Sequence, residues 1–500
     1  MKPYYTDESV TLHQGDCLDV LRELSDGSAD AAVCDPPYAL EFMGKAWDGW
    51  ATPKAFQSWC ESWATECLRV LKPGGHLLAF GGSRTWHRLA SAVEDAGFEI
   101  RDSIAWLYGS GFPKSMDVAK AIDRQRHDRD DVLRVTGFLR ECRDRAGVTN
   151  RRMDELFGFN GMASHWTALP ANSVAEVPSW QQWLELKALL GFGDEMDAEV
   201  WRLNGRKGTP GEAWDEREQV GEGFRIRKPS AVQIVGLSDG AYPITSAATE
   251  EARRFEGWGT ALKPAFEPIV VGRKPLVGTV AQNAIQHGTG ALHIDACRTG
   301  ADERTNPAGG MSSLQRISRV EHGYRRNVTA SSGEASTVAG RWPTNVVLDH
   351  TAAAVLDEQT GTLTSGKMRA GTERANRDGW AGAMPTTTGA GTYGDSGGAS
   401  RFFPVFRYEA KASSAERPEV NGVRHPTVKP LDFMRWLVRL VTPPGGLVLD
   451  PFAGSGTTAE ACVLERFRCI AIEREPEYLP LIVARLSKPI ALGFDFGEVE

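Results

Sequence analysis

The two ends of the chain carry the same alternation of short apolar runs and amphipathic stretches. The predicted strands are VTLHQ (10–14), ADAAVC (29–34), HLLAFGG (76–82), EIRDSIAWLY (99–108), GLVLD (446–450) and RCIAIE (468–473). The predicted helices are 17–24, 56–75, 85–98, 457–467 and 476–486. This alternation is typical of βαβ units with parallel strands. Because neither end holds enough strands for a sheet of its own, we expect one α/β sheet that joins both ends.

The middle of the chain interrupts this alternation. Residues 131–166 have helical periodicity that is broken by a turn at 146–149, followed by a second short helix and a second glycine turn. This layout suits a helix-turn-helix. Residues 366–400 are rich in Gly, Thr, Ser and Ala and predict a long, mobile loop. The middle is therefore expected to form insertions in the sheet domain.

Composition sets limits on partners and location. The formal net charge of -8 argues weakly against a nucleic-acid partner, because phosphates are bound by local positive charge. Between 298 and 326, however, Arg298, Arg304, Arg316, Arg319, Arg325 and Arg326 stand against Asp302, Glu303 and Glu321. That segment either follows a phosphate backbone or is a solvated loop. No signal peptide and no long apolar run are found, which predicts a cytoplasmic protein without membrane contact.

The eight cysteines are scattered along the chain and form no pair with the spacing of metal ligands. We therefore expect reduced, mostly buried thiols and no metal site.

A rigid turn follows the predicted strand 29–34. Proline cannot continue a sheet ladder, so Asp35-Pro36-Pro37-Tyr38 must leave the strand at its carboxyl end. In open α/β sheets, ligands bind at that edge. This turn is the first candidate site.

A glycine-rich turn, Asp450 to Thr458, lies between a predicted strand and a predicted helix. Glycines let a ligand approach the backbone, although such a turn can also reflect tight packing alone. Glu473 ends the next strand, about 20 residues after the turn, where a carboxylate can bind both hydroxyls of a ribose. The spacing FxGxG disfavours a dinucleotide and leaves a smaller nucleoside ligand such as S-adenosylmethionine.

These features, with HPTVKP at 425–430, together resemble the DNA amino-methyltransferases that modify adenine N6 or cytosine N4. The order, DPPY first and FxGxG last, is similar to the permuted β group, and the middle resembles longer bacteriophage and prophage members. The resemblance implies a circularly permuted, Rossmann-like S-adenosylmethionine-dependent sheet with a helical insertion and a target-recognition region. Residues 104–115 and 258–276 resemble the two strands that close the far edge of that sheet.

The resemblance assigns catalysis to the DPPY turn. Asp35 and Pro36 would accept the two amino hydrogens of a flipped-out base, Pro37 would lock the turn, and Tyr38 would stack on the base. The cofactor-binding residues that it implies are Asp16, Thr427, Lys429, Asp450, Phe452, Gly454, Gly456, Thr457 and Glu473. Two of these have alternatives: Asp16 as the N-cap of helix 17–24 and Lys429 as a surface lysine.

The resulting plan of the chain has six parts. They are the first part of the core (1–112), a helical insertion with the helix-turn-helix (113–261), a core edge strand (262–277), a target-recognition region with the loop 366–400 (278–424), the cofactor-binding part of the core (425–488) and a tail (489–500). The insertion either contacts DNA, with Asn150, Arg151 and Arg152 opening its second helix, or serves packing and protein contacts.

The expected substrate is double-stranded DNA, methylated on adenine N6. A second copy of the chain and a restriction endonuclease are possible partners between which the sequence does not decide. Three alternatives stay open: cytosine N4 methylation, methylation of a protein amide, and a DNA-binding regulator that has lost catalysis.

Overall fold

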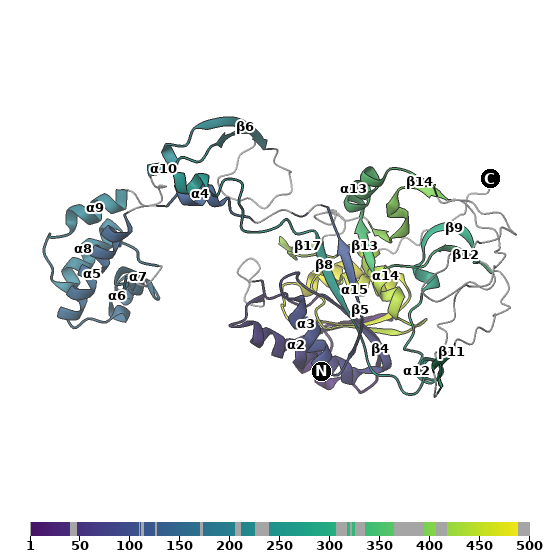
Figure 1. The fold of residues 1–500 in the computed structure, drawn as a ribbon. Helices are drawn as coiled ribbons and strands as arrows, with labels where there is room; N and C mark the ends of the chain where they lie inside the picture. The colour runs from purple at the N-terminus through teal and green to yellow at the C-terminus, as the bar shows by residue number, and fades with distance from the viewer. Residues whose placement is uncertain are drawn as a thin grey trace. The chain divides into compact units, whose positions relative to one another are not determined.

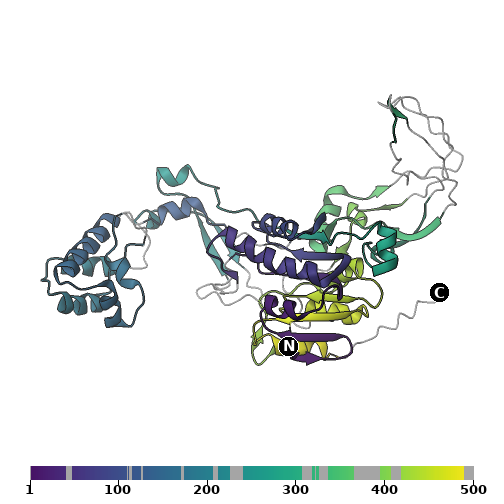
Figure 2. The same cartoon turned by 90° about the horizontal axis from the view of Figure 1, so that it is seen from below.

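The structure is a computed structural model. It describes residues 2–40, 48–109, 111, 115–125, 128–170, 174–205, 212–225, 240–306, 318–320, 323–325, 336–364, 395–406 and 418–488. They fall in two compact units (Figures 1 and 2): Met1–Gly111 with Pro264–Glu500, and Phe112–Lys263. The predicted tail at 489–500 and most of the predicted loop, 366–394, lie outside the described residues.

The first unit is built on one large sheet. Its described strands, in spatial order, are β1 (Tyr5–Thr6), β2 (Val10–Gln14), β20 (Arg468–Glu473), β19 (Leu447–Asp450), β3 (Ala29–Cys34), β4 (Leu71–Phe80), β8 (Phe266–Arg273), β5 (Glu99–Leu107), β13 (Val346–Asp349) and β16 (Val405–Phe406). The strands from β2 to β4 are parallel. Strand β8 runs antiparallel to both β4 and β5, and β1 runs antiparallel to β2. The sheet is therefore mixed at both sides of a parallel centre.

Strands from the two ends of the chain pair directly in this sheet. Ala31 and Ala32 of β3 pair with Val448 and Leu449 of β19, and β2 pairs with β20 along its whole length. Every residue of β3 is buried, as expected for a strand covered on both faces. The prediction that both ends form one α/β sheet is confirmed.

Helices cover both faces of the sheet. Ala31 and Val33 belong to the core on one face, whereas Ala32 and Cys34 belong to the core on the other, as the two-residue period of a strand requires. The first face packs against α14 (Leu431–Val441), α15 (Thr457–Leu464) and α16 (Leu479–Leu486). The second packs against α1 (Cys17–Glu23), α2 (Pro53–Val70) and α3 (Trp86–Asp95).

Two expectations about this sheet are wrong. Helix α2 ends at Val70 and β4 begins at Leu71, because Pro73 excludes its predecessor from helical backbone. The far edge is not closed by β5 and β8, since β13 and β16 continue the sheet beyond β5. Both extra strands come from the region assigned to target recognition.

The first unit carries further short elements around the sheet. They are α12 (Val280–His287), η3 (Asp295–Cys297), β9 (Thr299–Asn306), β10 (Ser318–Val320), β11 (Gly323–Arg325), β12 (Ser336–Arg341), α13 (His350–Thr360), β14 (Leu363–Thr364), β15 (Ser396–Gly397), η4 (Ala399–Phe402), β17 (Glu419–Val420) and β18 (Val423–Arg424). The arginine-rich segment runs through β9, β10 and β11, while Arg316 and Arg326 lie outside the described residues. Its contact with a phosphate backbone stays a prediction.

The second unit is mainly helical. Its elements are α4 (Val118–Asp123), α5 (Arg129–Arg145), α6 (Asn150–Phe157), α7 (Met162–Trp166), α8 (Trp180–Leu190), α9 (Asp197–Gly205), α10 (Glu212–Asp215), β6 (Gln219–Arg225), β7 (Gly240–Thr245) and α11 (Glu250–Arg253). Helices α5 to α9 share a core that includes Leu139, Trp166 and Trp183. The predicted helices and turns of 131–166 are confirmed, with Thr149 capping α6 and Gly158 ending it. A role in DNA contact stays a prediction.

Among the described residues, no helix is long and apolar enough to cross a membrane. All eight cysteines are buried and free, as the sequence predicts.

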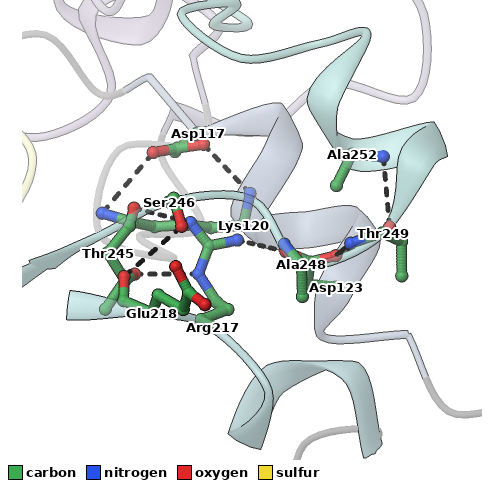
Figure 3. Close-up of polar contacts among 10 residues, drawn as sticks. All are labelled: Asp117, Lys120, Asp123, Arg217, Glu218, Thr245, Ser246, Ala248, Thr249 and Ala252. Atoms are coloured by element: carbon green, nitrogen blue, oxygen red, sulfur yellow. Dashed lines mark hydrogen bonds and ion pairs between the residues drawn. The ribbon is translucent and has the colours of Figure 1, made fainter. Parts of the chain in front are cut away.

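A buried ion pair joins α4, β6, β7 and α11. Figure 3 shows Asp123 among the residues that link these elements. Its carboxylate accepts hydrogen bonds from the Arg217 guanidinium, the Ala248 N–H (3.0 Å) and the Thr249 hydroxyl (2.8 Å). Arg217 also donates to the hydroxyl and the carbonyl oxygen of Thr245, at 2.8 and 3.0 Å. The side chains of Asp123 and Arg217 are 0% and 4% exposed, so neither has water as a substitute partner.

Replacing Asp123 by Ala should destabilise this part of the second unit by about 3–5 kcal/mol, because the Arg217 guanidinium is left buried and unpaired. Hydrogen exchange of the full chain, read by mass spectrometry, should show amide exchange in β6, β7 and α11 faster by about 100-fold or more. As a control, Glu155→Ala breaks an exposed pair with Arg151 and should change local stability by less than about 1 kcal/mol. Unchanged exchange in Asp123→Ala would contradict the assignment.

Candidate active site

Four neighbouring parallel strands bring acidic residues to one edge of the sheet. The register pairs Leu449 with Ala32, Asp450 with Ala471, and Gln14 with Glu473, so β2, β20, β19 and β3 end close to one another. The acids at these strand ends are Asp16, Glu473, Asp450 and Asp35. The structure thus places the DPPY turn and the glycine-rich turn on adjacent strands, β3 and β19.

Both oxygens of the Asp35 carboxylate have a side-chain partner. The Tyr38 hydroxyl donates to Oδ1 (2.7 Å), and the Lys429 ammonium donates to Oδ2 (2.8 Å). The same ammonium lies 3.1 Å from the Tyr38 hydroxyl oxygen. Pro36 is buried behind the turn, and Pro37 and Tyr38 are partly exposed. The two side-chain contacts therefore fix the orientation of the Asp35 carboxylate at the carboxyl edge of the sheet.

Asp48 holds the backbone of this turn. Its Oδ1 accepts the N–H groups of Tyr38 and Ala39, both at 2.8 Å, and its Oδ2 accepts that of Leu40 at 3.1 Å. Asp48 is 1% exposed, and Ala39 has a φ of 55°, a strained value for a residue with a side chain. Three hydrogen bonds to a buried carboxylate hold this strained turn. No motif or spacing in the sequence points to Asp48.

Lys429 lies at the DPPY turn and is only 12% exposed, so the alternative of a surface lysine is wrong, while its cofactor role stays a prediction. Besides Asp35, its ammonium lies 3.4 Å from Oε2 of Glu267 on β8. Burial lowers the pKa of Lys429, but the carboxylates of Asp35 and Glu267 outweigh it and raise the pKa above its ordinary value. Burial raises the pKa of Glu267 and of Tyr38. Sequence reasoning missed Glu267, although a carboxylate in the apolar run FEPIVV is an available signal.

The glycine-rich turn is tied to the end of β20. The Gly454 N–H donates to Oε2 of Glu473 (2.7 Å), and the Glu475 N–H donates to Oε1 (2.8 Å). A carboxylate has about four acceptor positions, so Glu473 keeps acceptor capacity for a ligand. Gly456 has a φ of 79°, and a Cβ there would lie 2.9 Å from Ile482 of α16. Gly456 is thus needed for packing, which supports the structural alternative at that position.

Two carboxylates of this edge are hard to ionise. Burial raises the pKa of Asp450 to about 7, although hydrogen bonds from Thr458 and the Phe452 N–H oppose the shift. Burial also raises the pKa of Glu473 to about 7, against the N–H groups of Glu475 and Gly454. At neutral pH each of these two carboxyl groups is therefore partly protonated.

The remaining predicted cofactor residues lie around the same edge. Asp16 caps α1, since its Oδ1 accepts the Leu18 N–H at 2.9 Å, so the alternative given for it is realised. The ring of Phe452 packs against Trp59 and Trp63, with centroids 5.5 and 5.3 Å apart. The cofactor role of both residues stays a prediction.

Threonines flank the turn on two sides. Thr457 is buried at the start of α15, with its hydroxyl 3.0 Å from that of Ser455. The Thr427 N–H donates to the ring of His425 at 3.3 Å, and a Cβ at Gly454 would lie 3.2 Å from the same ring. The HPTVKP segment thus reaches both turns, through His425 at Gly454 and through Lys429 at Asp35. Among the described residues, no group of three or more His, Cys, Asp or Glu side chains could hold a metal ion.

The fold is an α/β sheet with two turns side by side at the carboxyl ends of its parallel strands, the edge at which such sheets bind ligands. A family model of DNA methylases, covering N6 and N4 amino-methylases, matches residues 29–124 and 318–484, more than half of the chain. The chain belongs to this family. The matched residues include the DPPY turn, HPTVKP and the glycine-rich turn. The fold class expected from the sequence is confirmed, while the permutation and the bacteriophage resemblance stay predictions.

Individual relatives match over shorter stretches. The Type II methyltransferase M.BamHI of Bacillus amyloliquefaciens is 36% identical over 117 residues, which is 23% of this chain and 27% of the relative. The Type II methyltransferase M.HinfI of Haemophilus influenzae is 28% identical over 120 residues, 21% of this chain and 33% of the relative. The chain thus matches about a quarter to a third of the length of these relatives. The solved PvuII DNA methyltransferase (cytosine-N4-specific) is similar at 13% identity, with a TM-score of 0.40 over 98% of this chain and 90% of that one.

The pKa of Asp450 predicts a pH-dependent stability. The folded pKa of about 7 exceeds the unfolded value of about 4, so the folded chain binds the proton more tightly. The free energy of unfolding should then fall as the pH rises from about 4 to about 7, by up to about 4 kcal/mol from this group. Asp450→Asn should raise the thermal midpoint at pH 8, and the gain should shrink toward pH 4. Asp432→Asn, at a side chain that is 70% exposed, serves as the control and should show no gain in thermal midpoint over wild type at pH 8. An equal trend in wild type and Asp450→Asn would contradict the assignment.

Removing the Asp48 carboxylate should loosen the DPPY turn. Asp48→Ala leaves three backbone N–H groups without their acceptor, each at a cost of about 1–3 kcal/mol if it stays buried. Hydrogen exchange of the amides of residues 38–40 should accelerate in Asp48→Ala, and less in Asp48→Asn, which keeps one acceptor oxygen. Asp26→Ala, at a side chain that is 80% exposed, serves as the control. Wild-type exchange in Asp48→Ala would show that other contacts hold the turn.

Proposed function

We propose that this chain is a site-specific DNA methyltransferase that transfers the methyl group of S-adenosylmethionine to N6 of a flipped-out adenine. One observation carries the proposal: β3 and β19 pair in parallel, which puts the Asp35 turn beside the glycine-rich turn at the carboxyl edge. The turn proposed to bind the cofactor and the turn proposed to bind the amino nitrogen are thus neighbours. Membership of the DNA methylase family supports the reaction class.

The residues of the edge fit an S-adenosylmethionine molecule. Glu473 is 8% exposed and keeps acceptor capacity for the ribose hydroxyls, while the Gly454 N–H holds its carboxylate in place. Asp16, Asp450, Phe452, Gly456, Thr457 and Thr427 are the further residues proposed to line the cofactor site. When bound, the cofactor supplies a methyl group on a sulfonium, which is already activated for transfer.

Asp35 and Pro36 would provide the two hydrogen-bond acceptors that activate an exocyclic amino group. Its lone pair is conjugated with the ring, so the nitrogen is a weak nucleophile until its hydrogens are bound out of the ring plane. The Asp35 carboxylate and the Pro36 carbonyl would accept the two hydrogens and turn the lone pair toward the methyl group. Positioning and electrostatic stabilisation would supply much of the acceleration. Pro37 would keep the two acceptors at a fixed separation.

The Tyr38 hydroxyl occupies the acceptor atom that the base would use. It donates to Oδ1 of Asp35 in the structure, and Lys429 already holds Oδ2. An incoming amino group would therefore replace the hydroxyl on Oδ1, and the ring of Tyr38 would move to stack on the base. Extruding a base from the duplex costs roughly a few kcal/mol, and stacking offsets part of it.

Adenine is proposed over cytosine because Asp stands first in DPPY, which in the resemblance is more typical of adenine enzymes. Cytosine N4 is the second candidate and uses the same acceptors. Membership of the DNA methylase family supports DNA as the substrate, and double-stranded DNA and a restriction endonuclease partner are proposed with it. A second copy of the chain is a further proposed partner.

Expression in a bacterial host without DNA methylation tests the proposal. Single-molecule sequencing of the host DNA should show N6-methyladenine at one short motif. Cytosine N4 marks would keep the mechanism and overturn the base assignment. Unmodified DNA would overturn the proposal and favour a protein amide substrate or a DNA-binding regulator without catalysis.

Asp35→Ala is the matched variant for this experiment. It should lower the methyl-transfer rate by at least about 100-fold, because the amino group loses its charged acceptor. Binding of S-adenosylmethionine, measured by calorimetry, should change by less than about threefold, since Asp35 lies on the neighbouring turn. Wild-type activity in Asp35→Ala would remove Asp35 from the mechanism.

A further inference from the structure

Glu267 is an acid near the DPPY turn to which the proposed chemistry gives no role. It lies near the start of β8, opposite Trp106 of β5, and its side chain is 19% exposed. A carboxylate in a largely buried strand is costly unless a charge partner compensates it. That partner is Lys429, whose Nζ lies 3.4 Å from Oε2 of Glu267.

The Lys429 ammonium is held from several sides. It contacts Oδ2 of Asp35, the Tyr38 hydroxyl oxygen and Oε2 of Glu267, which gives each of its three N–H donors an acceptor. It also lies 4.8 Å from the ring centroid of Phe80. Its side chain is 12% exposed. These contacts together fix the position of the ammonium, and the contact with Glu267 is one of them.

We infer that Glu267 is a positioning residue of the methyl-transfer site, which acts on Asp35 through Lys429. Glu267 anchors the ammonium, and the ammonium keeps Oδ2 of Asp35 occupied. Oδ1 is then the carboxylate oxygen that exchanges its partner, from the Tyr38 hydroxyl to the amino group of the base. This inference rests on the proposed function.

The charges of the three groups favour the reaction in a second way. Asp35 and Glu267 together carry two negative charges against the single positive charge of Lys429. As the amino nitrogen takes the methyl group, the carbon–sulfur bond breaks and the positive charge passes from sulfur to nitrogen, which then loses a proton to solvent. A fixed negative excess beside the amino nitrogen favours that movement of charge. Removing the Glu267 charge should therefore slow the chemical step and leave cofactor binding intact.

The test compares Glu267→Gln, Glu267→Asp and Glu99→Gln in the full chain. Glu99 pairs with Arg273 at the other end of β8 (2.6 Å). Glu99→Gln therefore removes a carboxylate that contacts the same strand but lies away from the DPPY turn. Glu267→Gln should lower the single-turnover rate of DNA methylation by about 10- to 100-fold, because the acceptor carboxylate is misplaced. The Kd values for S-adenosylmethionine and duplex DNA should stay within about twofold. Glu267→Asp keeps the charge and should restore part of the rate, and Glu99→Gln should match wild type.

Two outcomes overturn the inference alone. One is a wild-type rate in Glu267→Gln with an active wild-type enzyme. The other is a rate that falls only together with the thermal midpoint and both Kd values, and that Glu267→Asp fails to restore, because such a pattern marks a structural role. A wild-type chain that does not methylate DNA overturns the proposed function as well, which distinguishes the two failures.

Discussion

The pairing of β3 with β19 is the contact on which the site depends. It joins strands that are more than 400 residues apart in the sequence, through Ala31 with Val448 and Ala32 with Leu449. Because side chains alternate along a strand, a slip of one residue in this register would turn Asp35 and Asp450 to other faces. The apolar layers on both faces exclude that slip, since Ala31 and Ala32 belong to different cores. The core that stabilises the fold thus also aligns the two turns.

Local patterns were sufficient to predict the central strands. The predicted strands 10–14, 29–34 and 468–473 coincide with β2, β3 and β20, because each is an apolar run that ends at a polar or proline-rich turn. Strands β13 and β16 escaped prediction because they are four and two residues long. Segments that short carry no periodicity. They become strands because β13 pairs with the edge of β5 that no other described strand occupies, and β16 pairs with β13.

In the candidate site, too, some residues could be predicted from local sequence patterns and others could not. The DPPY and glycine-rich turns were found because backbone chemistry marks them in the sequence. Glu267 and the contact of Lys429 with Asp35 were missed because they join segments far apart in the sequence: Lys429 meets Asp35 across 394 residues of chain. Asp48 lies only 8 to 10 residues from its partners, but it belongs to no motif. Glu267 stands out in the sequence only as a carboxylate in an apolar run, and that signal does not say which group it contacts. Packing alone decides which carboxylate receives the ammonium.

The charge of the edge limits how a duplex could be held there. Asp16, Asp35, Asp450 and Glu473 gather at the strand ends, and even with the pKa of Asp450 and of Glu473 near 7 the edge is acidic. Such an edge attracts a sulfonium cation and repels phosphates, whereas an extruded base is uncharged and can enter. With a formal net charge of -8, phosphate contacts require a local positive excess elsewhere, as in the arginine-rich segment 298–326. In the proposed function, base capture and backbone binding therefore belong to separate parts of the chain.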